Sequence, residues 1–132
     1  MRALALTVML VLPGTPALAA LSCPERLPEA APAPFERQGL GAGRGNRSPL
    51  TEAWVVQGEA GEETKPAPAI SAPDSSSGRP PRFTNSWDLS SRDPMLLVCI
   101  YRDGVWLRAP LPEGTRRCVQ SGEAARMTMR CE

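Results

Sequence analysis

The chain has 132 residues and is nearly neutral, with 15 lysine and arginine residues against 14 aspartate and glutamate residues. This length suits one domain, and the scattered basic residues form no stripe of the kind that nucleic-acid binding requires. The absence of histidine excludes the Ser-His-Asp and Cys-His mechanisms and most metallohydrolase sites. The 15 prolines and 11 glycines argue against a helical fold, because proline removes a backbone donor and glycine weakens helices.

The N-terminus has the pattern of an export signal: Arg2, an apolar run over 3–12, a Pro-Gly break and small residues up to Ala19. Cleavage near Ala19 removes residues 1–19 and leaves a periplasmic or secreted chain of about 113 residues. The apolar run is about half the length of a membrane-spanning helix, so no membrane span is expected in the mature chain. The sequence Ala-Leu-Ser-Cys ending at Cys23 resembles a lipoprotein signal, which leaves lipidation of Cys23 as the alternative.

Composition divides the mature chain into two parts. Residues 20–49 are dominated by Ala, Pro, Gly and Arg, and they predict an irregular N-terminal arm of which little packs against a core. A small β domain is expected over 50–132, with its first strand at 52–57. Within that domain, residues 58–82 are rich in Glu, Pro, Ser and Gly and predict a long flexible loop.

Five further strands are expected after this loop. Residues 83–89 alternate in polarity, and 95–101 form a continuous apolar run that is typical of a strand covered on both faces. An Asp-Gly turn leads to a partner strand over 105–109, and reversals at 110–114 and 121–123 lead to strands over 115–120 and 127–131. The fold class is therefore mainly β, a small antiparallel meander sheet with long irregular loops.

Four cysteines in an exported chain of this size predict two structural disulfides, so the sheet is expected to be disulfide-stapled. The pairing Cys23–Cys99 with Cys118–Cys131 fits the expected hairpins best, and Cys99–Cys118 with Cys23–Cys131 remains open. No Cys-x-x-Cys pair and no histidine are present, so neither a metal site nor a redox centre is expected. The sequence predicts no cofactor.

The candidate binding surface rests on aromatic and basic residues, which are enriched where proteins bind partners. It consists of Tyr101, Trp106 and Arg116. Trp106 follows a tight turn on a strand that otherwise shows an arginine to solvent, and Arg116 is placed to hold an anionic partner. The other tryptophans, Trp54 and Trp87, are assigned to the core.

Carboxylates are the remaining candidates for catalysis, because two of them in one cleft can hydrolyse a glycosidic bond. The acidic residues near the expected strands are Asp88, Asp93, Asp103 and Glu113. Each stands beside a turn or loop residue, where acidic side chains are commonly solvated. The sequence therefore predicts no catalytic residues and a protein that is not an enzyme.

Several short motifs follow one another along the chain: Cys-Pro at 23–24, Trp-Asp-Leu at 87–89, Cys-x-Tyr at 99–101, Pro-Leu-Pro-x-Gly at 110–114, Cys118 and a C-terminal Cys131. Their combination resembles a family of short uncharacterised proteobacterial exported proteins. The likeness covers the chain from Leu50 onward together with Cys23. It implies a periplasmic location and a disulfide-bonded β domain, and it carries no established activity.

Two hypotheses of different classes follow. The first is an exported, non-catalytic binding protein whose partner is an envelope protein: an inhibitor of a cell-wall-active enzyme, or an immunity protein against a secreted toxin. The second is a small carboxylate-dependent hydrolase of cell-wall glycans, and a structural envelope component stands behind both. The sequence predicts no oligomeric state.

Overall fold

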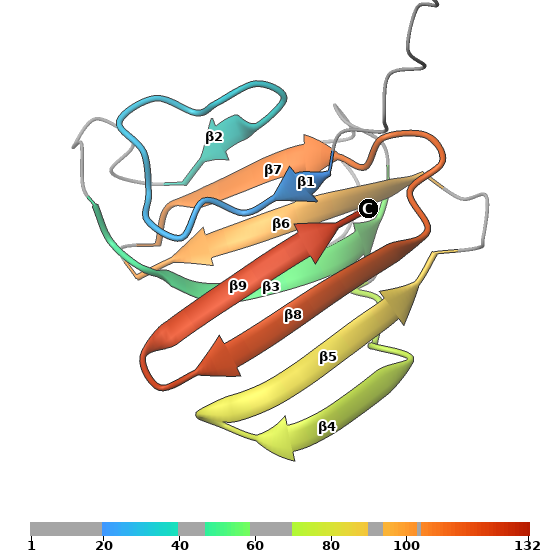
Figure 1. Ribbon diagram of the computed structural model, residues 1–132. Coiled ribbons are helices and arrows are strands. Elements are labelled where there is room, and N and C mark those ends of the chain that lie inside the picture. The colour runs from blue at the N-terminus through green and yellow to red at the C-terminus, as the bar shows by residue number, and fades with distance from the viewer. Residues whose placement is uncertain (1–19, 40–46, 59–69, 90–93, 103) are drawn as a thin grey trace, which may run out of the picture.

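The computed structural model describes residues 20–39, 47–58, 70–89, 94–102 and 104–132, and these form two antiparallel β-sheets that face each other (Figure 1). The five-stranded sheet contains, in spatial order, β1 (Leu21–Ser22), β9 (Arg126–Cys131), β8 (Arg117–Glu123), β5 (Arg82–Asp88) and β4 (Ser75–Arg79). The four-stranded sheet contains β2 (Glu36–Gln38), β7 (Trp106–Pro110), β6 (Met95–Tyr101) and β3 (Leu50–Gln57). Every described element is a strand, and the described residues include no helix that could cross a membrane.

The core lies between the sheets, because alternate residues of each strand point to opposite faces. The four-stranded sheet contributes the fully buried residues Val55, Leu97, Cys99, Leu107 and Ala109. The five-stranded sheet contributes Trp87, Cys118, Met129 and Cys131. This arrangement confirms the mainly β, antiparallel class, and it also confirms Trp87 as a core residue.

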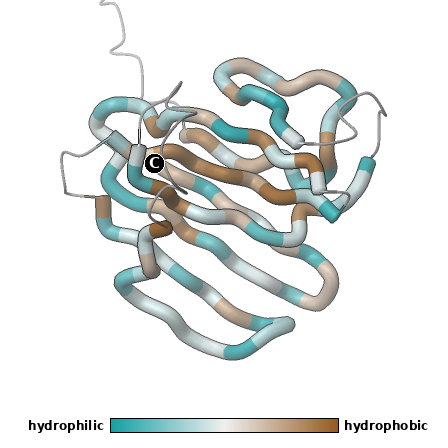
Figure 2. Tube along the Cα trace, turned by 180° about the vertical axis from the view of Figure 1, so that it is seen from behind, coloured by the Kyte–Doolittle hydropathy of each residue, from teal (hydrophilic) through white to brown (hydrophobic). Residues whose placement is uncertain are grey.

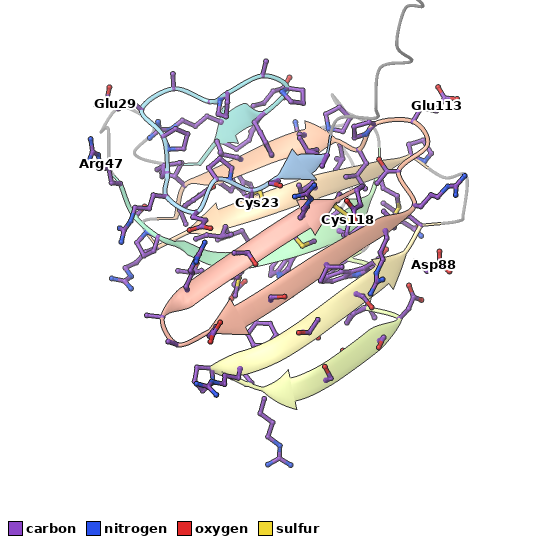
Figure 3. The ribbon with its side chains drawn as sticks, in the orientation of Figure 1. Cys23, Glu29, Arg47, Asp88, Glu113 and Cys118 are labelled. Carbon is purple, nitrogen blue, oxygen red and sulfur yellow. A yellow bond between two sulfur atoms is a disulfide. The ribbon has the colours of Figure 1, made fainter. Side chains whose placement is uncertain are left out.

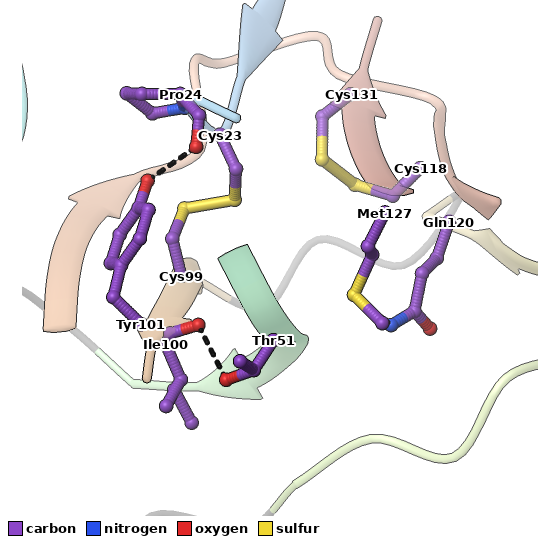
Figure 4. Close-up of a disulfide and its surroundings, with 10 residues drawn as sticks. All are labelled: Cys23, Pro24, Thr51, Cys99, Ile100, Tyr101, Cys118, Gln120, Met127 and Cys131. Carbon is purple, nitrogen blue, oxygen red and sulfur yellow. Dashed lines mark hydrogen bonds between the residues drawn. A yellow bond between two sulfur atoms is a disulfide. The ribbon is translucent and has the colours of Figure 1, made fainter. Parts of the chain in front are cut away.

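Both expected disulfides are present in the preferred pairing (Figure 4). Cys118 and Cys131 are direct partners across β8 and β9, with their Cα atoms 4.0 Å apart. Cys23 and Cys99 are bonded across 76 residues and join the N-terminal arm to the central strand β6. One disulfide therefore lies within the five-stranded sheet, and the other links the arm to the four-stranded sheet.

The N-terminal arm contributes to the core, which corrects the expectation that little of it would pack. Its buried side chains are Leu21, Cys23, Leu27 and Phe35. The arm runs from β1, at the edge of one sheet, to β2, at the edge of the other, and covers the side between β9 and β7 (Figure 1). The composition concealed this role, because a few apolar residues spaced along a Pro- and Ala-rich segment are enough to cover the side of a small sandwich.

The expected loop over 58–82 contains a strand, β4, and residues 59–69 lie outside the described part. Strand β4 is fully exposed, and it is held by backbone pairing with β5 instead of by side-chain burial. A composition argument based on burial therefore missed it. The preceding segment closes the second side of the sandwich, because Ser71 donates its amide to Val55 while its carbonyl accepts a 2.9 Å bond from the indole of Trp87.

The four C-terminal strands do not form one meander. β6 and β7 belong to the four-stranded sheet, and residues 111–116 cross to the other sheet, where β8 and β9 form the next hairpin. The Pro-rich reversal is thus the link between the two layers. The expected turn at 121–123 also differs, since Gly122 lies within β8 and the turn is formed by Ala124 and Ala125.

Candidate functional site

The solvent side of the four-stranded sheet is apolar at its centre, and we call this set of residues the apolar outer face. Strand register places its members side by side across β3, β6 and β7: Trp54 beside Val98, Val56 beside Leu96, and Ile100 beside Trp106. In the view from behind, the strands of this sheet carry the strongest hydrophobic colour, whereas the β4–β5 hairpin is pale to teal (Figure 2). Solvated faces of antiparallel sheets are usually polar, so this composition requires an explanation.

The apolar outer face is packed as a second cluster, separate from the core between the sheets. Val56, Leu96 and Val98 are buried in it, and Trp54 and Ile100 pack against them. The cluster is rigid because each of its members stands on a hydrogen-bonded strand. An ordered apolar patch on a sheet surface is a common mark of a protein-binding site.

Trp106 and Ile70 are the two large hydrophobic side chains that the described residues expose, at 43% and 55%. Trp106 lies between Ile100 of β6 and Gln38 of β2, at one end of the apolar outer face. Ile70 is paired with Val56 at the free edge of β3, at the opposite end. Exposed aromatic and aliphatic side chains therefore stand at both ends of the buried cluster.

A charged pair borders the apolar outer face on the β7 side. Arg108, the cross-strand neighbour of Val98, approaches Glu36 of β2 with an Nη2 to Oε2 distance of 3.5 Å. The carboxylate is well exposed and the contact is long, so the pair contributes little to stability. Its position instead gives the face the polar rim that surrounds the apolar centre of protein interfaces.

The structure does not bring the three predicted binding residues together. Tyr101 is 1% exposed, so its assignment to the surface is wrong, and its hydroxyl donates a 2.6 Å hydrogen bond to the carbonyl of Pro24 (Figure 4). Burial raises the pKa of this phenol. Arg116 is exposed but lies just before β8 of the five-stranded sheet, away from the apolar outer face, and its amide donates to the carbonyl of Glu132, which follows β9.

Of the three predicted binding residues, Trp106 is the one that the structure places on an exposed apolar surface. The prediction for Trp54 was wrong. The sequence assigned Trp54 to the core, but it packs half-buried in the outer cluster. A signal was available in residues 50–57, where Ala53 and Val55 alternate with Trp54 and Val56. Both alternating sets are apolar, so β3 presents an apolar side on each face of its sheet.

The candidate carboxylates lie at scattered positions. Asp88 ends β5, Glu113 lies in the link from β7 to β8, and both are exposed at the periphery of the molecule (Figure 3). Asp93 and Asp103 lie outside the described residues. Within the described ranges, no group of three or more acidic, cysteine or histidine side chains is arranged to hold a metal ion.

Together, the fold and this face define a small disulfide-bonded β-sandwich of the binding-module class, with an apolar patch, a tryptophan and a charged rim. A family model described as type VI secretion system Tli immunity protein matches residues 44–132, about two thirds of the chain. The chain belongs to this family, which confirms the immunity-protein hypothesis and implies a toxin as its partner. Searches of curated proteins and of solved structures found no match.

Proposed function

We propose that the protein is a periplasmic immunity protein that binds a type VI toxin without catalysis, and that the apolar outer face is the surface that contacts the toxin. The observation that carries this proposal is the exposed Trp106 beside a buried apolar cluster on the solvent side of a sheet. Family membership supplies the occupant, a toxin, and the fold supplies the surface.

The physical argument concerns what a partner gains by covering this face. Trp106 and Ile70 are exposed, so their contact with a partner removes apolar area from water, and the cluster beneath them needs no rearrangement. Tryptophan and arginine are both enriched in binding hot spots. The Arg108–Glu36 pair then supplies orientation more than affinity.

The periplasmic location is supported by the cysteines. All four are in disulfides, and such bonds persist in oxidising compartments. The export signal expected at residues 1–19 agrees with this location. A partner toxin delivered to the same compartment would meet the oxidised, folded chain.

The test begins by identifying the toxin as a type VI effector whose periplasmic expression stops growth unless this chain is co-expressed. Trp106→Glu is then compared with Thr84→Glu, an exposed strand position on the outer side of the five-stranded sheet. Both variants add one negative charge to an exposed strand. We expect Trp106→Glu to weaken binding to the toxin at least about 30-fold by calorimetry and to abolish growth protection, because it places a charge in the hot spot.

Thr84→Glu should bind within twofold of wild type and protect fully. If both variants protect equally, the apolar outer face is not the toxin-binding surface. If no type VI effector is neutralised by the wild-type chain, the immunity function itself fails for this chain.

A further inference from the structure

The end of the sandwich carries a cleft of about 330 Å³, distinct from the apolar outer face. Four segments surround it: the β4–β5 turn at 80–81, the β8–β9 turn at 124–125, the start of β3 and the end of β6. Leu50, Phe83 and Met127 form an apolar lining. The cleft is therefore bounded by elements of both sheets.

The apolar wall of the cleft includes a ring that packs directly over a glycine. Phe83 and Gly122 are cross-strand partners in β5 and β8. A Cβ atom on Gly122 would lie 2.2 Å from the ring atom Cε1 of Phe83, so only glycine lets the ring lie against β8. Gly122 thus leaves the space that the ring occupies at this wall of the cleft.

The charge of the cleft is one-sided. Arg102 and Arg126 line it, and none of the described residues that line it is acidic. Arg126 is already engaged, because its Nε and Nη2 donate to the two carboxylate oxygens of Glu25 at 3.0 and 2.5 Å. No ion pair joins Arg102 to a carboxylate in the described part of the chain. A guanidinium beside an apolar wall is matched by a carboxylate that carries an apolar neighbour.

The cleft also adjoins the apolar outer face. Thr51 lines the cleft, and its hydroxyl donates a 3.1 Å hydrogen bond to the carbonyl of Ile100, a member of that face. Arg102 lies two residues after Ile100, directly after the end of β6. One partner can therefore contact the sheet face and the cleft together.

We propose that this cleft receives an acidic segment of the toxin, with a carboxylate on Arg102 and an apolar side chain against Phe83 and Met127. The proposal rests on the proposed function for its partner and adds the chemistry that the partner presents. Opposite charge here fixes the register of the complex and speeds association. Its strength must therefore fall with ionic strength.

The test uses the oxidised full chain and the toxin identified by growth protection, titrated at low and at high sodium chloride. Arg102→Glu should weaken binding at least tenfold at low salt, and high salt should reduce this difference. Arg130→Glu is the matched control, because Arg130 is exposed on the outer side of β9 and pairs weakly with Glu132 at 3.7 Å. Ala125→Trp, which fills the cleft without changing charge, should also weaken binding at least tenfold.

A second probe addresses the cleft alone. The peptide acetyl-Leu-Asp-Phe-amide should bind and shift the amide resonances of Gly122 and Met127. Its affinity should be at least fivefold higher than that of acetyl-Leu-Asn-Phe-amide, and Arg102→Glu should remove this preference. Binding of the toxin within twofold of wild type by both Arg102→Glu and Ala125→Trp would overturn the proposal. So would equal binding of the two peptides.

The failure of this proposal is distinguishable from failure of the proposed function. If Trp106→Glu weakens toxin binding while the cleft variants do not, the apolar outer face stands and the cleft proposal falls. If the wild-type chain dimerises and Arg102→Glu abolishes only the dimer, the occupant is a second copy and the proposal is also overturned.

Discussion

The two outer faces of the sandwich differ sharply, although both belong to antiparallel sheets with apolar inner faces. On the four-stranded sheet the outer positions carry tryptophan, valine, leucine and isoleucine. On the five-stranded sheet most of the outer positions at its centre carry hydroxyl side chains, with Val119 and Arg130 as exceptions: Ser75, Ser77, Thr84, Ser86, Ser121 and Thr128. The inner faces are alike because they build one core, whereas the outer apolar residues of the four-stranded sheet pack into a second cluster of their own.

Strand β6 shows the difference best. Its outward residues Leu96 and Val98 are as well covered as many core residues, at 4% and 8% exposure, but they are covered by neighbours on their own face. The inward residues Leu97 and Cys99 are covered by the opposite sheet. A continuous apolar strand can therefore mean a core on one side and a partner surface on the other.

The largest effect is expected from the disulfides, one of which lies within the five-stranded sheet while the other links the N-terminal arm to the four-stranded sheet. Replacing Cys23 and Cys99 by alanine should lower the free energy of unfolding by about 4.5 kcal/mol, because the bond closes a long loop of 76 residues. Replacing Cys118 and Cys131 by alanine should cost about 3 kcal/mol, since that bond spans 13 residues. Denaturant unfolding of both pairs measures the difference.

The two pairs of variants are matched, because each removes two buried sulfur atoms. The first pair should also weaken toxin binding, since it releases the arm from β6 beneath the apolar outer face, whereas the second should leave binding unchanged in the folded protein. Equal losses of stability and binding would show that the two disulfides do not differ in this way.

The next effect sharpens the comparison of the outer faces. Trp54→Ala should lower the free energy of unfolding by about 2 kcal/mol, because it removes half-buried packing from Val56 and Val98. Thr84→Ala, at an exposed outer position of the other sheet, should change it by less than about 0.5 kcal/mol. Thermal unfolding of the two variants decides this, and a loss below 1 kcal/mol for Trp54→Ala would mean that the outer cluster adds little to the fold.

Much of the fold followed from local sequence signals. The six strands expected from apolar runs and alternation are present, and of the two disulfide pairings left open the structure shows the one that the Cys118–Cys131 hairpin favoured. What failed depends on long-range packing. The sequence pattern shows that β6 is apolar on both sides, but it does not show whether a second sheet or a partner covers each side.

The candidate site was predictable only in part, for the same reason. Trp106 was identified because its strand also shows an arginine to solvent. Tyr101 was misplaced because its burial depends on Pro24, which lies 77 residues away and accepts its hydrogen bond. The cleft is formed by segments from four separate parts of the chain, so no local sequence pattern could have predicted it.

A smaller effect concerns Tyr101, which joins the arm to the four-stranded sheet. Tyr101→Phe should lower the free energy of unfolding by about 1 kcal/mol at pH 7, because the Pro24 carbonyl loses its partner. The chain has no other tyrosine, so the difference between wild type and this variant isolates one phenol. Denaturant unfolding at several pH values measures it.

The pH dependence of that difference has a fixed sign. Burial raises the pKa of Tyr101 above its ordinary value of about 10, so the unfolded chain loses the proton first as pH rises. The stabilisation is complete well below pH 10 and falls as the pH rises through 10, by about 1.4 kcal/mol in total at pH 11. Wild type and Tyr101→Phe should therefore be nearly equal in stability near pH 11, and a constant difference would contradict the buried phenol.

The smallest expected effect lies in the β8–β9 hairpin of the five-stranded sheet. Ala124 adopts a φ of +53° in a two-residue turn, where the Cβ atom is unfavourable and glycine is not. Ala124→Gly should therefore raise the free energy of unfolding by about 0.5–1 kcal/mol. Ala125→Gly should lower it by a similar amount. Ala125 has an ordinary φ, so a glycine there relieves no strain and only increases the conformational entropy of the unfolded chain. If the two substitutions change the free energy of unfolding in opposite directions, the hairpin that borders the cleft holds backbone strain at Ala124. If both change it in the same direction, the turn has another conformation, and the cleft loses the rigid boundary that it requires.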